Sequence, residues 1–152
     1  MTGAEARAEN RPFTTLDPLA RRLRLPSGRE TILTDTVGFL HRLPHHLIEA
    51  FRSTLEEAQD AAILLHVLDA ADPLALEQAE AVRNVLDMLE LRDKPIITVL
   101  NKRDQVADEA RLAELSAHLP SAVAISALKR QGIGELLQLL DQQLAQASQA
   151  AV

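Results

Sequence analysis

The chain has 152 residues, of which 47% are apolar and only 2% aromatic, so it is long enough for one domain with a core of Leu, Val, Ile and Ala. It has no cysteine, which excludes a disulfide scaffold and a thiolate metal site. It also has no apolar run long enough to span a membrane and no secretory signal after Met1, so we expect a cytoplasmic protein. The net charge of −6 is uneven, because residues 1–52 hold 8 basic and 6 acidic side chains and residues 53–152 hold 8 and 16, so the basic end is either a solvated face or a contact for phosphate-rich RNA.

The first 18 residues contain a loop with two neighbouring hydroxyl groups. Residues 1–12 have weak periodicity, which is typical of the end of a helix that runs into a loop. The sequence Phe-Thr-Thr-Leu-Asp-Pro then places Thr14 and Thr15 beside a proline. These hydroxyls are either ordinary turn residues or oxygen ligands of the kind that Mg²⁺ prefers.

An antiparallel hairpin is predicted next, with strands over residues 19–25 and 30–35 and a Pro-Ser-Gly turn between them. The second strand ends in a D-x-x-G pattern that begins at Asp35 and ends at Gly38. An aspartate in that place can hold Mg²⁺ through water, and a glycine lets its amide approach a γ-phosphate closely. Alone, the pattern is weak because it occurs often by chance.

A helix–strand–helix unit is predicted between residues 45 and 90. An apolar stripe at spacings of three and four indicates a helix over about residues 45–59, and the apolar run over 61–68 indicates a buried strand that closes in Asp69. Asp72 followed by Pro73 is typical of a helix N-cap, so we expect the second helix to run from there to about Glu90.

The segment over residues 95–104, Pro-Ile-Ile-Thr-Val-Leu-Asn-Lys-Arg-Asp, carries the most chemistry. Its β-branched run predicts a buried parallel strand, and the polar residues follow where open α/β sheets bind ligands. The Asp104 carboxylate can accept two hydrogen bonds from the ring N–H and amino group of guanine, a donor pair that adenine lacks. Asn101 can hold the loop and reach the other base edge, and the stem of Lys102 can lie across the base. The alternative is a polar turn that contains these residues by chance.

The remaining elements are a helix over about residues 108–118, a strand over 123–126 and an amphipathic helix over 132–146, followed by a tail over 147–152 that we expect to fray. The last strand ends in Ser126-Ala127-Leu128. A backbone N–H in this turn could meet the guanine oxygen.

Four motifs, FTTLDP, DTVGFL, NKRD and SAL, occur in this order and each follows the expected element. They resemble the switch I, switch II, base-specificity and final base-contact motifs of a translational GTPase-type G domain. The sequence between these motifs, from TLDPLARRLRLPSG through LLHVLDAADP, resembles that of the HflX-type ribosome-associated GTPases almost throughout. This resemblance extends to about Leu140.

The resemblance implies an α/β fold of the P-loop NTPase type, with a G domain over residues 1–146 built on a mainly parallel sheet flanked by helices. It implies binding of GTP and Mg²⁺, GTP hydrolysis and association with the large ribosomal subunit. By carry-over, Thr15 is the switch I ligand of Mg²⁺ with Thr14 as second choice, Asp35 contacts Mg²⁺ through water, and Gly38 contacts the γ-phosphate. The base-binding residues carried over are Asn101, Lys102, Asp104, Ser126 and Ala127.

One departure from the family concerns the phosphate-binding loop. None of the five glycines precedes a Lys-Ser or Lys-Thr pair, so G-x-x-x-x-G-K-[ST] is not found in the sequence. In the family this loop lies just upstream of the segment that residues 1–5 resemble. We therefore expect a chain that begins after the first strand, the phosphate loop and most of the first helix, and that does not hydrolyse GTP alone. The alternative is a non-catalytic remnant, or a module with a G-domain-like shape that binds a protein or the ribosome.

Overall fold

The computed structural model describes residues 20–36 and 58–150, which belong to two compact units, Met1–Asp60 and Ala61–Val152. Several predicted features lie outside the described residues, among them Thr14, Thr15, Gly38 and most of the helix predicted over 45–59. Residues 58–60, at the end of that prediction, are helical.

Residues 20–36 of the first unit contain a hairpin of β1 (Ala20–Arg24) and β2 (Glu30–Thr34), paired antiparallel. Its turn is closed by the N–H of Leu25, which donates to the oxygen of Arg29 across 2.8 Å. Gly28 has a φ of +85° in this turn, a conformation that residues with a side chain rarely adopt. The predicted hairpin is confirmed, with strands slightly shorter than expected.

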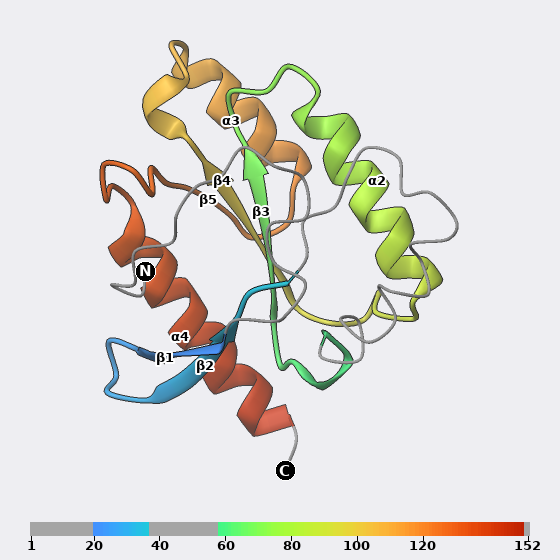
Figure 1. The fold of residues 1–152 in the computed structure, drawn as a ribbon, viewed down its shortest axis with the longest axis vertical. Helices are drawn as coiled ribbons and strands as arrows, with labels where there is room; N and C mark the ends of the chain where they lie inside the picture. The colour runs from blue at the N-terminus through green and yellow to red at the C-terminus, as the bar shows by residue number, and fades with distance from the viewer. Residues whose placement is uncertain (1–19, 37–57, 151–152) are drawn as a thin grey trace. The chain divides into compact units, whose positions relative to one another are not determined.

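The second unit is built on a parallel sheet in the order β3 (Leu64–Asp69), β4 (Ile96–Asn101) and β5 (Ala122–Ala124) (Figure 1). The central strand is buried on both faces, because Ile97 and Leu100 point to opposite sides and each is fully buried. The predicted α/β architecture, a mainly parallel sheet flanked by helices, is therefore confirmed.

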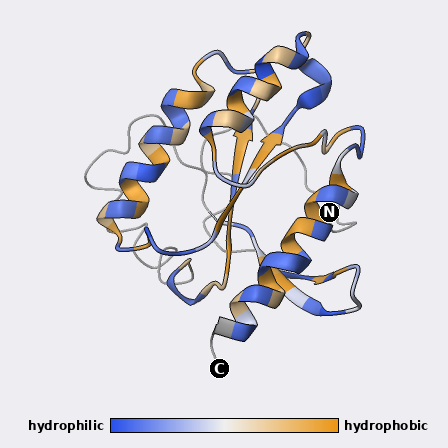
Figure 2. Cartoon of the chain, turned by 180° about the vertical axis from the view of Figure 1, so that it is seen from behind, coloured by the Kyte–Doolittle hydropathy of each residue, from blue (hydrophilic) through white to orange (hydrophobic). Residues whose placement is uncertain are grey.

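Three α-helices accompany this sheet. Helix α2 (Ala75–Met88) packs against β3, α3 (Glu109–His118) packs against β5, and α4 (Ile133–Ala150) ends the described chain. Along these helices hydrophobic positions recur among hydrophilic ones, as expected for elements with one buried stripe (Figure 2). The core between the sheet and helices α2 and α3 consists of Leu68, Ala70, Ala75, Ala79, Leu100, Leu112, Leu115 and Leu119. None of the described helices is long and apolar enough to cross a membrane.

The start of α2 corrects one prediction. Asp72 does not cap the helix, because its Oδ1 accepts the N–H of Leu74 across 2.8 Å within a turn that precedes the helix. Its backbone oxygen also accepts the N–H of Ala75 across 3.2 Å. Pro73 lies inside this turn rather than in the helix, so the N-cap is Leu74 and the first helical residue is Ala75.

Other boundaries also differ from the prediction. Strand β3 begins at Leu64 rather than at residue 61, and β5 spans Ala122–Ala124 rather than 123–126 because Ser126 turns away to pair with Gln131. Helix α4 continues past residue 146 to Ala150, since the Ala- and Gln-rich end of the chain consists of residues that favour helix. Fraying of the tail over 147–152 stays a prediction.

Candidate functional site

Polar side chains gather at the carboxyl ends of β3, β4 and β5. Asp69 and Asn101, the last residues of β3 and β4, are register partners, and the N–H of Ala70 donates to the backbone oxygen of Asn101 across 2.9 Å. On the other side of β4, the N–H of Ile125 donates to the oxygen of Leu100 across 2.8 Å. The three strand ends therefore form one edge, the place where open α/β sheets bind ligands.

The chain reverses sharply after β4. Lys102 has a left-handed conformation, with φ 62° and ψ 30°, and the short 3₁₀-helix η1 (Arg103–Gln105) follows it. A side-chain-bearing residue in this conformation costs on the order of 1 kcal/mol, so the surrounding bonds must hold it. The N–H of Gln105 donates to the oxygen of Lys102 across 2.9 Å, and the N–H of Arg103 donates to the oxygen of Ile125 across 3.0 Å. This turn carries Asp104 toward the loop that follows β5.

The loop after β5 is closed by its own backbone. Ser126 and Gln131 exchange two N–H···O bonds of 3.0 Å each, which join the ends of the loop. Within it, Ser126 is fully buried, and its Oγ accepts the N–H of Lys129 across 3.1 Å. Leu128, at the tip of the loop, is 82% exposed. The buried serine therefore holds the base of the loop while the tip is open to solvent.

Two side-chain hydrogen bonds join the loops. Ser126 Oγ donates to Asp104 Oδ1 across 2.6 Å, and the N–H of Ala127 donates to Asn101 Oδ1 across 3.1 Å. The Ser126 bond, assisted by a backbone N–H and the charge of Lys129, lowers the pKa of Asp104 below its usual value despite an opposing contribution from burial. Asp104 is therefore a carboxylate at neutral pH.

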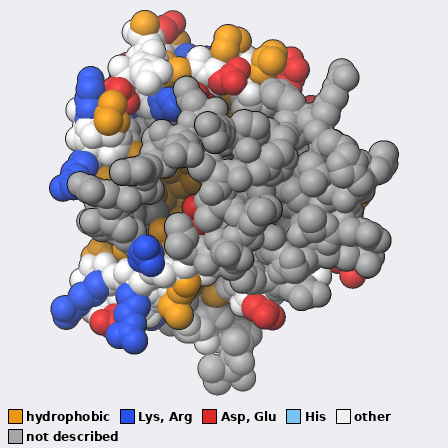
Figure 3. Space-filling model, in the orientation of Figure 1, with side chains coloured by type: hydrophobic (Ala, Val, Ile, Leu, Met, Phe, Trp, Pro, Cys, Tyr) orange, Lys and Arg blue, Asp and Glu red, His pale blue; other side chains and the backbone are white. Residues whose placement is uncertain are grey.

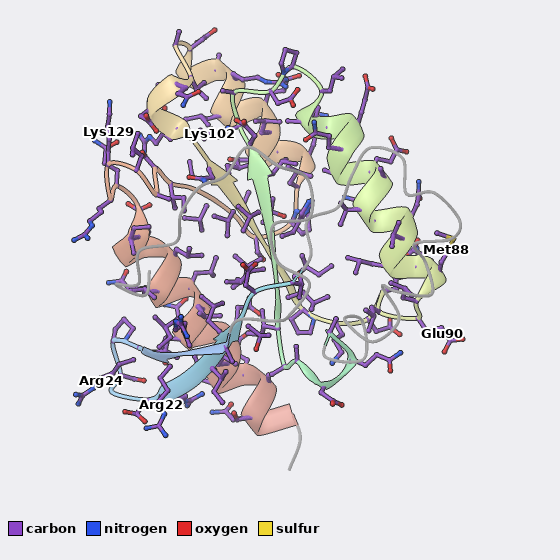
Figure 4. The ribbon with its side chains drawn as sticks, viewed as in Figure 1. Arg22, Arg24, Met88, Glu90, Lys102 and Lys129 are labelled. Atoms are coloured by element: carbon purple, nitrogen blue, oxygen red, sulfur yellow. The ribbon has the colours of Figure 1, made fainter. Side chains whose placement is uncertain are left out.

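Asp69, which the sequence analysis did not assign to the site, belongs to it. Its Oδ2 lies 2.6 Å from Lys102 Nζ, and its Oδ1 accepts the N–H of Ala71 across 3.0 Å. Figure 4 shows Lys102 and Lys129 at this end of the sheet. The signal that could have found Asp69 is its position, because an acidic residue that ends the strand next to β4 must lie beside the turn after Asn101.

The arrangement can bind a flat, polar ring. The second oxygen of Asp104, Oδ2, makes no hydrogen bond to another described residue, so it can accept an N–H from a ligand. Asn101 offers its amide NH₂, and Lys102 offers an apolar stem beside a cation. An open pocket on the surface also reaches Asp104 and is lined by Arg103, Asp104, Val106, Glu109 and Gln131.

The site residues predicted from the sequence fall into two groups. Those expected to bind a base lie together at the sheet edge, namely Asn101, Lys102, Asp104, Ser126 and Ala127. Those expected to bind phosphate and metal are not brought together in the described chain. Thr15 and Gly38 lie outside it, and Asp35 is an exposed residue just after β2 in the first unit. In the described ranges, no group of three or more His, Cys, Asp or Glu residues could hold a metal ion.

Comparison with known families gives a match over most of the chain. The sequence model of a family described as "50S ribosome-binding GTPase" matches residues 1–102. The chain is also similar to curated proteins named GTPase HflX. It is 48% identical over 136 residues to that of Treponema denticola, covering 88% of this chain and 35% of the relative. It is 41% identical over 146 residues to the GTPase HflX of Escherichia coli, and this match covers 95% of this chain and 34% of the relative. The chain thus spans about a third of the length of these relatives.

The structure of this chain is also similar to solved structures of other proteins. The crystal structure of a complex of SsGBP with GDP has a TM-score of 0.71 and 29% identity, over 89% of this chain and 44% of that one. A point variant of Aquifex aeolicus Era bound to GDP·AlF4⁻ has a TM-score of 0.60 and 24% identity, over 81% and 43%, which supports the fold alone.

Proposed function

The chain belongs to the family of 50S ribosome-binding GTPases, and from that premise we propose that it contributes the guanine-recognition part of an HflX-type G domain that binds and hydrolyses GTP. The observation that carries the proposal is the convergence of Asn101, Asp104 and Ser126 from two loops at one edge of a parallel sheet. These residue types at such an edge suit a base that offers adjacent N–H donors.

Asp104 selects the base in this proposal. Its carboxylate accepts the ring N–H and the exocyclic amino group of guanine, with Oδ2 available and Oδ1 shared with Ser126. Adenine has no such pair of donors, and it would leave the carboxylate facing an acceptor nitrogen. The discrimination therefore comes from an unpaired charge against the wrong base rather than from shape.

Asn101, Lys102 and Ala127 complete the base site. The NH₂ of Asn101 reaches the far edge of the base while its Oδ1 holds the loop after β5 through the Ala127 N–H. That N–H is engaged before a ligand arrives, so it contacts the guanine oxygen only by sharing or exchanging its partner. The stem of Lys102 lies over the ring, and its ammonium stays with Asp69.

The phosphate and metal end of the site is assigned by resemblance. We infer that Thr15, or Thr14, and Asp35 hold Mg²⁺ and that Gly38 contacts the γ-phosphate. Asp35 is exposed and offers a hard oxygen, which suits an ion that keeps several waters and takes only one or two protein ligands. When bound, Mg²⁺ neutralises phosphate charge during hydrolysis.

We place its action at the large ribosomal subunit in the cytoplasm, and the family description "50S ribosome-binding GTPase" supports the ribosomal part of this proposal. Because a G-x-x-x-x-G-K-[ST] loop is not among the 152 residues, the triphosphate contributes little affinity to this stretch, and binding of the base is the activity to test on it. We therefore expect millimolar rather than micromolar affinity for a nucleotide.

The test is a ¹H–¹⁵N NMR titration of the ¹⁵N-labelled chain with four nucleoside monophosphates. GMP should shift the amide signals of Ala127 and Lys129, which lie on the loop held by Ser126. IMP, which lacks the amino group, should shift them less, and AMP and CMP should leave them unchanged. The exposed Asp93, between α2 and β4, provides the control variant Asp93→Asn, which should keep the response to GMP. Equal shifts with GMP and AMP would show that this edge does not select guanine.

A further inference from the structure

The hairpin of the first unit exposes four arginine side chains. Residues Arg21, Arg22, Arg24 and Arg29 lie on β1 or in its turn, and all four are exposed. We call these four residues the arginine ribbon. Figure 3 shows Lys and Arg side chains gathered in the part of the surface where Figure 1 draws this hairpin. The chain as a whole carries a net charge of −6, so this is a local concentration of positive charge on an acidic protein.

The strand register separates the two faces of the hairpin. Alternation places Arg22 and Arg24 on one face, and both project from β1 in Figure 4. The opposite face carries Leu23, which is only 5% exposed. Across the strands, Arg22 is the register partner of Ile32, a side chain that is 68% exposed. The outward face thus combines the guanidinium groups of Arg22 and Arg24 with the exposed aliphatic side chain of Ile32 and, opposite Arg24, the exposed carboxylate of Glu30.

Within the described chain no carboxylate forms an ion pair with the arginine ribbon, although Glu30 is the register partner of Arg24. The four ion pairs found there join Arg92 to Asp87, Lys102 to Asp69, Arg103 to Glu109 and Arg111 to Glu114, all in the second unit. In the ribbon, the guanidinium of Arg21 makes a long contact of 3.4 Å with the oxygen of Ala20. The side chains of Arg22, Arg24 and Arg29 form no hydrogen bond or ion pair with another described residue.

We propose that the arginine ribbon is a docking surface for the phosphate backbone of structured RNA, an inference that rests on and deepens the proposed function. Side chains two apart on a strand are about 7 Å apart, close to the spacing of successive phosphates, so Arg22 and Arg24 can each form a two-pronged contact with one phosphate. Ile32 supplies an aliphatic surface for a ribose or base beside them. Contacts of this kind to structured RNA go to phosphates and 2′-hydroxyls across its wide, shallow minor groove, because its major groove is too deep and narrow for side chains to read.

RNA fits this surface better than an acidic polypeptide does. The carboxylates of a polypeptide are carried on flexible stems, whereas phosphates repeat at fixed intervals on a stiff backbone and match a rigid ribbon. Residues 53–152 hold 8 basic and 16 acidic side chains, so they repel a polyanion on balance, and this repulsion is screened beyond about 8 Å at physiological salt.

The experiment measures binding of the full chain to a short fluorescein-labelled RNA hairpin of mixed sequence by fluorescence anisotropy, at about 50 mM and about 200 mM KCl. The test variant is Arg22→Gln with Arg24→Gln. Its matched control is Arg83→Gln with Arg92→Gln, which removes the same charge from two exposed arginines of the second unit. A third variant, Arg22→Lys with Arg24→Lys, keeps the charge and removes the guanidinium fork. Circular dichroism checks that each variant is folded.

We expect the test variant to bind RNA about 10- to 100-fold more weakly and to lower the slope of log affinity against log salt by about one to two. The matched control should stay within about twofold, and the lysine variant should fall between. Equal losses of RNA affinity in the two glutamine variants would show that only the net charge of the chain matters, and would overturn the proposal. So would a lysine variant as weak as the glutamine variant, or displacement of RNA by poly-glutamate at equal charge, which would point to an acidic protein partner.

This outcome is separable from the proposed function. RNA binding needs no nucleotide, so a chain whose Ala127 amide responds to GMP but which binds no RNA contradicts this inference alone. A chain that binds RNA through the ribbon but does not respond to GMP contradicts the guanine site alone.

Discussion

Ser126 Oγ donates a hydrogen bond to Asp104 Oδ1 across 2.6 Å. The serine is fully buried after β5, whereas the aspartate lies in η1 after β4, so one bond joins two loops that are 22 positions apart in the chain. It orients the carboxylate before any ligand arrives, which lowers the ordering cost of binding.

Replacing Asp104 with Asn should change the base that the site accepts. The amide can donate to the oxygen that xanthine carries where guanine has an amino group, and it can no longer accept two N–H bonds. We expect the affinity for GMP to fall on the order of tenfold or more and the affinity for XMP to rise. The NMR titration with both nucleotides measures this. An Asp104→Asn chain that still prefers GMP would remove Asp104 from base recognition.

Replacing Ser126 with Ala should release the Asp104 carboxylate. The pKa of Asp104 should rise toward the usual aspartate value of about 3.9, because the largest cause of its depression is removed. Affinity for GMP should fall about fivefold, since the carboxylate is no longer held in place. Carboxyl ¹³C NMR follows the pKa, and Ser148→Ala, which removes only an exposed bond to the Leu144 oxygen, is the control.

The hydrogen bond from Ser126 to Asp104 should make the stability of the fold depend on pH in one direction. A carboxyl whose pKa is lower in the folded than in the unfolded chain stabilises the fold above its unfolded pKa, and this contribution is lost as the pH falls through the folded pKa. The Asp104–Ser126 contribution should therefore be constant from about pH 5 to 8 and lost only in strong acid. Loss of the response to GMP between about pH 5 and 8 would contradict an ionised Asp104 as the binding group.

Replacing Asp69 with Asn should affect binding more than stability. The Asn oxygen can still accept the N–H of Ala71, whereas the ion pair with Lys102 is lost. Both side chains are partly exposed, so the stability change should be only about 0.2–1 kcal/mol. Affinity for GMP should fall about two- to threefold as the Lys102 stem loses its orientation. Asp87→Asn, which breaks the exposed pair with Arg92, should leave affinity unchanged.

Replacing Gly132 with Ala should destabilise the second unit. Gly132 has a φ of +71°, and an added Cβ would lie 2.4 Å from the backbone oxygen of Ala124 in β5. Because that oxygen is held in the sheet, we expect a loss of about 1–3 kcal/mol in the free energy of unfolding, measured by urea denaturation. Gly134 lies in α4 with open space around it, so Gly134→Ala should instead stabilise by up to about 1 kcal/mol. Equal effects at both glycines would contradict the geometry of this turn.

His66 on β3 should make the second unit less stable in mild acid. Burial, and to a smaller extent the charge of Arg83, lower the pKa of His66. The unfolded chain then binds the proton more tightly, so the free energy of unfolding should fall as the pH drops below about 6.5. In the His66→Gln variant this part of the pH slope should vanish. A slope equal to that of the parent would assign the acid sensitivity to other groups.

The sequence alone determined the elements and their polar ends. The β-branched run over residues 96–100 is long enough and apolar enough to specify a buried strand, and the Asn, Lys and Asp that follow had to lie at its carboxyl end. The amphipathic stripes likewise specified α3 and α4, because periodicity is set by neighbouring residues along the chain.

The exact ends of these elements depended on competing local bonds. Asp72 could cap a helix or close a turn two residues on, and both arrangements satisfy its carboxylate equally well on sequence grounds. In the structure Asp72 closes the turn, with its side chain accepting the N–H of Leu74 and its backbone oxygen accepting the N–H of Ala75.

Only the tertiary structure decided which polar side chains meet. The ion pair of Lys102 with Asp69 joins residues 33 positions apart, and it depends on the parallel register that sets Asp69 beside Asn101. The bond from Ser126 to Asp104 similarly requires β5 to pair with β4 and the left-handed turn at Lys102 to aim the carboxylate. Strand order and register depend on packing between segments far apart in the chain, and so the sequence supplied the site's residues and the fold supplied their pairing.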